Sequence, residues 1–196
     1  MSLEAWGTFW LSKSPHVPGS SFEEAHLPRL ATWARFKPRE PLAALDGSLP
    51  QQFFVFNTHF DHGPDRARER SARLLLKQIQ TICGLYPSIV MGDLNATPSS
   101  NAYAIITSSF LSDVRTHAEV EGRDCPVPTF TGWLSKSERP ASLEVDERRD
   151  WIIIDYILVS GWRALTYSVD LASRADGNSL SDHRPIVATL APMYYQ

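Results

Sequence analysis

The sequence has few cysteines and no long apolar run. Its 196 residues contain two cysteines, Cys83 and Cys125, which are too few for a disulfide scaffold and too isolated for a zinc knuckle. They favour a reducing compartment, with the cytoplasm slightly preferred. The strongest apolar run, residues 151–159, is interrupted by Asp155 and falls short of the ~18 residues that suggest a membrane helix. We therefore expect a protein without a membrane span.

An excess of charge of one sign is also lacking. The chain has 19 Lys and Arg against 22 Asp and Glu, which gives a formal net charge of −3. This balance argues against a broad basic surface that binds nucleic acid by its charge alone. The local density of basic residues is interpreted as a solvated helix face rather than a phosphate-binding patch; it comprises Arg66, Arg68, Arg70, Arg73 and Lys77.

Short apolar runs and two helical patterns alternate along the chain. Strands are predicted at 7–11, 29–36, 52–57, 88–91, 151–159, 164–169 and 185–190, and helices at about 65–83 and 99–107. Asp65 is the predicted N-cap of the first helix and Gly84 its stop, and 112–149 is expected to be mostly loop. Many strands and two helices in mixed order predict an α/β or α+β sandwich, in a single domain that spans residues 1–196.

Acids, amides and imidazoles cluster where predicted strands end. Each segment alone has an ordinary explanation as a turn or a strand terminus, but an acid within the 151–159 run needs a partner if it is buried. Together they indicate a site, because rigid strands commonly carry functional side chains at their ends. The segments are Asn57-Thr58-His59, Gly92-Asp93-Leu94-Asn95, Asp155, and Ser181-Asp182-His183-Arg184.

The chemistry that these residue types could share is phosphoester hydrolysis. Carboxylate and amide oxygens suit a hard ion such as Mg²⁺. A carboxylate could orient or deprotonate a water, while imidazoles donate to the developing charge. A zinc site is less expected, since neither cysteine lies at ligand spacing to a histidine. A dinuclear zinc hydrolase motif at residues 58–62 is a weaker alternative, because it lacks the preceding histidine of that pattern.

In this order, the four segments resemble the endonuclease/exonuclease/phosphatase superfamily. The resemblance covers nearly the whole chain. It implies a deoxyribonuclease I-like β-sandwich flanked by helices, with Mg²⁺, or alternatively Mn²⁺, as the cofactor. The implied activity is hydrolysis of a phosphoester by a water nucleophile, as a phosphatase or as a phosphodiesterase or nuclease. The substrate would be a small molecule or a nucleic acid, and the net charge of −3 favours a small phosphate ester over long duplex DNA.

The resemblance also implies roles for individual residues. His59 would stabilise the phosphoryl group. Asp93 would position or deprotonate the attacking water, and Asn95 would orient that water or contact the phosphate. Asp155 would hold and polarise His183, which would contact the phosphate.

Metal binding is where the sequence departs from the family pattern. Asp182 would ligate Mg²⁺ directly or through water, whereas Asp61 and His62 are interpreted as loop or substrate-edge residues. The family begins with a strand ending in asparagine and a second ending in Gln-Glu, and neither precedes Asn57. We therefore expect an N-terminally incomplete domain without these first strands, with a sheet edge that a partner chain or a second copy covers. The alternative is a non-catalytic truncated homologue that acts as a fragment or binding module.

Overall fold

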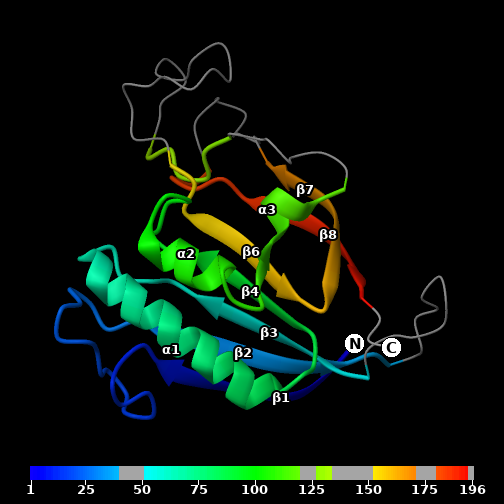
Figure 1. The fold of residues 1–196 in the computed structure, drawn as a ribbon, viewed down its shortest axis with the longest axis horizontal. Coiled ribbons are helices and arrows are strands. Elements are labelled where there is room, and N and C mark those ends of the chain that lie inside the picture. Colours follow the sequence, from blue (N-terminus) through cyan, green and yellow to red (C-terminus); the bar gives the residue numbers. More distant parts are fainter. Residues whose placement is uncertain (40–50, 120–126, 134–151, 171–179, 194–196) are drawn as a thin grey trace.

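The computed structural model describes residues 1–39, 51–119, 127–133, 152–170 and 180–193 (Figure 1). No helix among these residues is long and apolar enough to cross a membrane. The elements, in chain order, are β1 (Ser2–Trp10), β2 (Leu30–Lys37), β3 (Phe53–Thr58), α1 (Asp65–Cys83), β4 (Ser88–Asp93), α2 (Asn101–Thr107), β5 (Ser112–Asp113), α3 (Val114–His117), β6 (Asp155–Ser160), β7 (Trp162–Val169) and β8 (Ile186–Pro192).

Two sheets form the framework of the molecule. Within the described residues, the larger sheet has six strands in the order β1-β2-β3-β4-β6-β5, and the smaller one pairs β7 with β8. Helices α1 and α2 cover one face of the larger sheet (Figure 1). On its other face, apolar residues of β4 and β6 pack with those of α3, β7 and β8 in a second core cluster. This layering confirms the predicted mixed α/β sandwich.

In the described part of the chain, the two sheets differ in their number of strands. β1 and β2, which correspond to the strands predicted at 7–11 and 29–36, pair in the larger sheet over Ser2–Trp10 and Leu30–Lys37, and the absence of the family's first two strands stays a prediction. Among the described residues, the small sheet is the one with few strands, and β7 and β8 are each paired along one side only.

Helix α1 confirms the predicted span, but its N-terminus differs from the prediction. Pro64 occupies the N-cap without a side-chain hydrogen bond, and Asp65 is the first helical residue. The carbonyl of Pro64 accepts the first helical bond from the Ala67 amide. Gly84 ends the helix with a φ of 58°, a left-handed conformation that glycine adopts readily.

The basic face of α1 is less solvated than predicted, because two of its arginines hold other segments in place. The guanidinium of Arg68 has a side-chain exposure of 12% and donates to the carbonyl of Asp61. The guanidinium of Arg70 donates to Glu24 and lies 4.4 Å above the ring of Phe22. These contacts fix the segments before β2 and after β3 against the helix.

A close approach of β3 and β4 positions the end of the sheet that carries the polar residues. β3 and β4 run parallel, so both end at this edge, whereas β6 is antiparallel to β4 and begins there with Asp155 opposite Asp93. Gly92 has a φ of 135°, and a Cβ at this position would lie 1.9 Å from the carbonyl oxygen of Thr58. Only glycine fits this backbone, which brings the ends of β3 and β4 together.

Candidate functional site

Three carboxylate–imidazole contacts form the centre of the candidate site at this sheet edge. His59 follows β3, and its Nε2 lies 3.2 Å from Oδ2 of Asp93 at the end of β4. His183 precedes β8; its Nε2 lies 3.9 Å from the same oxygen, and its Nδ1 lies 2.9 Å from Oδ2 of Asp155. One carboxylate oxygen of Asp93 therefore faces two imidazoles. The other ring nitrogen of His183 binds the carboxylate of Asp155.

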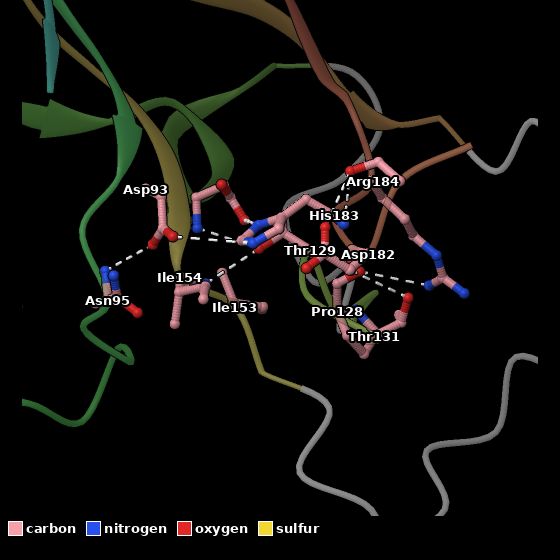
Figure 2. Close-up of polar contacts among 12 residues, drawn as sticks. Asp93, Asn95, Pro128, Thr129, Thr131, Ile153, Ile154, Asp182, His183 and Arg184 are labelled. Atoms are coloured by element: carbon pink, nitrogen blue, oxygen red, sulfur yellow. Dashed lines mark hydrogen bonds and ion pairs between the residues drawn. The ribbon is translucent and has the colours of Figure 1, made fainter. Parts of the chain in front are cut away.

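Asn95 fixes the other oxygen of Asp93. The Asn95 backbone amide donates to Asp93 Oδ1 at 2.7 Å, which makes the short side chain–backbone turn that aspartate favours. The backbone of Asn95 has a φ of 46°, and its side-chain amide donates to the carbonyl of Phe60 at 3.0 Å. Asp93 is thus oriented by the turn at Asn95, so that its Oδ2 points toward His183 (Figure 2) and lies 3.2 Å from Nε2 of His59.

Residues 127–133, which we name the Thr129 segment, hold the Asp155–His183 pair. The buried hydroxyl of Thr129 accepts hydrogen bonds at 3.1 Å from the backbone amides of Ile154 and Asp155. The ring of Phe130 lies 4.9 Å from the ring of His183. The Thr129 hydroxyl therefore supports the backbone of Asp155, and the ring of Phe130 packs against the imidazole of His183; Figure 2 shows Thr129 beside His183.

Asp182 lies beside this cluster, and its backbone also contacts the Thr129 segment. Its carbonyl accepts a hydrogen bond from the Thr131 amide at 3.0 Å, and its Oδ1 accepts one from the Ser181 hydroxyl at 3.3 Å. The structure therefore brings His59, Asp93, Asn95, Asp155 and His183 together, and it places Asp182 next to them in the turn before β8.

Burial and neighbouring charges shift the protonation of the central groups. Burial raises the pKa of Asp93, and the charge of Asp155 adds to this effect. Burial lowers the pKa of His59, and the positive charge of Arg29 lowers it further. For His183 burial opposes the charged form, but the hydrogen bond and charge of Asp155 prevail, so that its pKa is raised. The two imidazoles thus differ: His183 holds its proton more strongly than His59.

Other residues near the site were not found from the sequence alone. Thr129 and Phe130 contact Asp155 and His183, and Arg29 affects His59, although no strand-end motif marks any of the three. For Arg29 the signal is its position directly before β2. Because β2 and β3 pair with Ala31 opposite Thr58, this position lies at the same end of the sheet as His59.

Asp61 lies in the loop between β3 and α1, in agreement with one of the two predicted roles. Its side chain is 3% exposed, and its Oδ2 accepts a hydrogen bond from the His26 amide at 2.6 Å. Its carboxylate ties the segment before β2 to the segment after β3, whereas the side chain of His62 is more than half exposed. Among the described residues, no group with metal-ligand spacing includes any of residues 58–62, so the geometry gives no support to the zinc hydrolase alternative.

The donor set at the site fits a divalent cation. Asp93, Asp155 and His183 each offer one ligand atom, and these atoms lie within 4.8 Å of one another. Proteins hold Mg²⁺ through one or two carboxylates together with waters and substrate phosphates, and two carboxylates are present here. Asp182, the ligand predicted from the sequence, is not a member of this group.

Comparisons with known proteins identify relatives of this architecture. Residues 9–183 match the sequence profile of the endonuclease/exonuclease/phosphatase family. A protein of this family from Bacteroides vulgatus is 30% identical, with a TM-score of 0.74, and the match covers 97% of this chain and 66% of that one. No curated protein matches the chain in sequence.

Two further solved structures show the same fold. A conserved protein of unknown function from Enterococcus faecalis is 28% identical with a TM-score of 0.78. A mannosyl-6-phosphatase from Bacteroides thetaiotaomicron is 25% identical with a TM-score of 0.72. Each match covers 97% of this chain and 67% of the other. The chain thus spans about two thirds of the length of these relatives.

Proposed function

Because the chain belongs to the endonuclease/exonuclease/phosphatase family, whose members hydrolyse phosphoesters, we propose that it is a Mg²⁺-dependent phosphoester hydrolase with a water nucleophile. One observation carries this proposal: a single oxygen of Asp93 faces His59 at 3.2 Å and His183 at 3.9 Å. A base and two donors for phosphoryl oxygens at one sheet edge are the groups that such hydrolysis needs.

Asp93 is the group that we assign to the attacking water. Its Oδ1 is held by the amide of Asn95, so the carboxylate has a fixed direction. Its pKa is raised by burial, which brings a carboxylate closer to the range in which it removes a proton effectively at neutral pH. Asp93 would therefore orient the water and accept its proton as the oxygen attacks phosphorus.

The two histidines are assigned to the phosphoryl group. Asp155 keeps the Nδ1 side of His183 occupied and raises its pKa, so that Nε2 carries a proton toward the site. A protonated imidazole donates to a phosphoryl oxygen and offsets the charge that develops there. His59, whose pKa is lowered, would contact the same group as a neutral donor.

Asp182 is assigned to the metal ion, as proposed from the sequence. Asp93 and Asp155 also belong to a group of possible ligands, but their carboxylates are assigned to the attacking water and to His183. When bound, Mg²⁺ would neutralise phosphoryl oxygens. Mn²⁺ is the alternative ion, because it also accepts carboxylate and water ligands.

A small phosphate ester is the substrate class that we favour. The net charge of −3 provides no broad attraction for a long polyanion. The mannosyl-6-phosphatase among the relatives acts, by its name, on a sugar phosphate. Nucleic acid is the alternative substrate.

The main competing function is that of a non-catalytic binding module. It is favoured by the coverage of about two thirds of the relatives' length and by a small sheet in which the described residues form two strands. In either case a partner chain or second copy would cover an edge of that sheet, and light scattering at defined concentrations would detect such a dimer.

Hydrolysis assays with matched variants test the proposed function. We expect phosphate release from mannose 6-phosphate to require Mg²⁺ or Mn²⁺ and to stop on addition of EDTA. Asp93→Ala and His183→Ala should abolish it. His117→Ala is the matched control, because His117 is an exposed histidine on α3, and α3 follows β5, which pairs with β6 away from Asp155. Hydrolysis that survives both site substitutions would overturn the proposal. So would the absence of hydrolysis by the wild-type chain with every phosphomonoester and diester tested.

A further inference from the structure

A cavity lies at the end of the large sheet that is opposite to the candidate site. Its volume is about 640 Å³, and small-molecule sites usually have about 300–1,000 Å³. Ser88 and Ser160 both line it and pair with each other, whereas Asp93 and Asp155 pair at the other end of the same two strands, β4 and β6. Five residue steps along β4 separate the cavity from the site by about 16 Å.

The walls of this cavity are apolar. Ile79 and Cys83 of α1, Leu85 and Tyr86 after this helix, and Phe110 after α2 supply most of its surface. Burial raises the pKa of the Cys83 thiol to about 12, so the thiol stays neutral. No Asp, Glu, Lys, Arg or His is among the described residues that line the cavity. The cavity therefore fits an apolar group and provides no partner for a charged one.

Large apolar side chains at the rim of the cavity are open to water. Leu85 is 96% exposed, Tyr86 45% and Phe110 37%. Single exposed apolar residues are ordinary, but several gathered around one hollow are typical of a binding site. A Cβ at Gly84, which also lines the cavity, would meet nothing within 4 Å, so the backbone leaves the rim uncovered at this point.

A polar groove adjoins the cavity along α1. It lies between α1 and α2, which run side by side over the same face of the large sheet (Figure 1). Gln80 lines both the groove and the cavity. Arg73 and Lys77, about one helical turn apart, also line the groove. Glu69 is the only acid among the described residues that line it, and its carboxylate accepts a hydrogen bond from the Asn101 side chain at 3.0 Å.

The two cations of this groove differ from other basic residues of α1. Arg68 and Arg70 both pair with acids, whereas Arg73 and Lys77 are exposed and form no ion pair within the described part of the chain. The helical rise from Lys77 to Cys83 in the cavity wall is about 9 Å. A groove with an excess of positive charge therefore lies directly beside an uncharged apolar cavity.

We propose that the cavity and the groove together bind an anionic amphiphile, a small molecule with one anionic group and an apolar tail. The tail would lie in the cavity, and the anionic group would lie between Arg73 and Lys77. Charge complementarity selects the anionic group, and the uncharged apolar walls select the tail. This site is separate from the proposed hydrolase site, so the inference goes beyond the proposed function and does not depend on it.

Decanoate is the probe that tests this inference. Its addition should move the backbone amide signals of Gln80, Gly84 and Ser88 in NMR spectra, while those of Asp93 and His183 stay in place. Each buried methylene strengthens binding by about fourfold, so octanoate, which is two methylenes shorter, should bind roughly 15-fold more weakly. Acetate, which has no tail, should not move the cavity signals.

Substitutions distinguish the contribution of the anionic group from that of the tail. Arg73→Gln and Lys77→Gln each remove one cation and should weaken decanoate by about 1.5- to 5-fold, while the affinity for uncharged decanol stays the same. Leu85→Ala removes part of the apolar rim and should weaken both probes equally. The matched controls are Arg66→Gln, at the start of α1, and Leu3→Ala, in the outer strand β1; both side chains are exposed, and neither change should affect binding.

Three outcomes would overturn the inference, and they differ from a failure of the proposed function. If decanoate moves only the signals of Asp93 and His183, it binds at the candidate site. If Arg73→Gln and Lys77→Gln both leave decanoate unchanged, the cations have no role in binding. If the cavity signals shift with protein concentration before any probe is added, a second copy of the chain covers the cavity. A chain that binds decanoate in the cavity but hydrolyses no phosphoester would refute the hydrolase and leave this site intact.

Discussion

The close approach of β3 and β4 at Gly92 predicts a specific steric cost for any side chain there. A Cβ at this position would lie 1.9 Å from the Thr58 carbonyl oxygen, whereas real Cβ atoms essentially never come within 3.0 Å of another atom. In Gly92→Ala the strands must therefore separate by about 1 Å. Because Asp93 follows immediately, this separation would also displace the carboxylate from His59, and we expect a loss of activity together with the loss of stability.

The expected loss of stability in Gly92→Ala has two contributions, and substitution of a second glycine distinguishes them. An L-residue at a positive φ costs about 1–2 kcal/mol, and forcing atoms into a packed site adds about 1–3 kcal/mol. Gly84→Ala is the control, since Gly84 has a φ of 58° with nothing within 4 Å and carries the first term only. For a chain of this size the Tm of Gly92→Ala should fall below that of Gly84→Ala by about 2–12 °C.

Thermal unfolding of both variants, followed by circular dichroism, provides this comparison. Equal Tm values for the two variants would refute the steric argument, because both place alanine at a positive φ and only Gly92→Ala adds a clash. A lower Tm for Gly92→Ala with unchanged hydrolysis would show that the strands part without moving Asp93, and would refute the link between this contact and the site.

Three further substitutions test the electrostatics and the support of the site. Asp155→Asn removes the charge that raises the pKa of His183, so this pKa, followed by NMR of the imidazole protons, should fall; an unchanged value would exclude the pairing. Arg29→Gln removes a positive charge that lowers the pKa of His59, so that pKa should rise in the same titration. Thr129→Val leaves two backbone amides without their acceptor and should cost about 1–3 kcal/mol in urea unfolding. Thr129→Ser keeps the hydroxyl and should cost only about 0.8 kcal/mol, the value of one buried carbon group.

The residues that follow strands directly were predictable from the sequence. Asn57-Thr58-His59 and Gly92-Asp93 follow aromatic or aliphatic runs that become β3 and β4, and parallel neighbouring strands end at the same edge of a sheet. The arrangement of these two strands therefore predicts that His59 and Asp93 lie close together, as the structure shows. The turn bond from Asn95 to Asp93 is local as well, since it joins residues two positions apart.

The start of β6 depends on distant residues, and here the prediction was wrong. The apolar run from residue 151 predicts a strand with Asp155 in its middle, but β6 begins at Asp155. Ile152 pairs with Phe130 only in an isolated bridge, and the amides of Ile154 and Asp155 donate to Thr129. These partners are 25 and 26 residues apart, so no local pattern marks where the strand begins.

The roles of Asp61 and Arg68 also depend on tertiary contacts. Asp61 lies two residues after His59, a predicted site residue, yet its buried carboxylate accepts a hydrogen bond from the amide of His26, 35 residues away. Arg68 belongs to an alternating charged pattern typical of a solvated helix face, but its guanidinium donates to the Asp61 carbonyl. Charge and spacing alone do not distinguish an arginine in water from one that satisfies a buried carbonyl.

The protonation role of Asp93 is the central claim, and one substitution tests it most directly. Asp93→Asn retains the size of the side chain and an oxygen that can accept from the Asn95 amide, but it cannot take a proton from water. The measurement is the rate of inorganic phosphate release from mannose 6-phosphate at saturating Mg²⁺. The account predicts a kcat lower by about 10²- to 10⁴-fold with KM nearly unchanged. A kcat within about twofold of wild type would contradict the assignment of Asp93 as the base and, with it, the proposed mechanism.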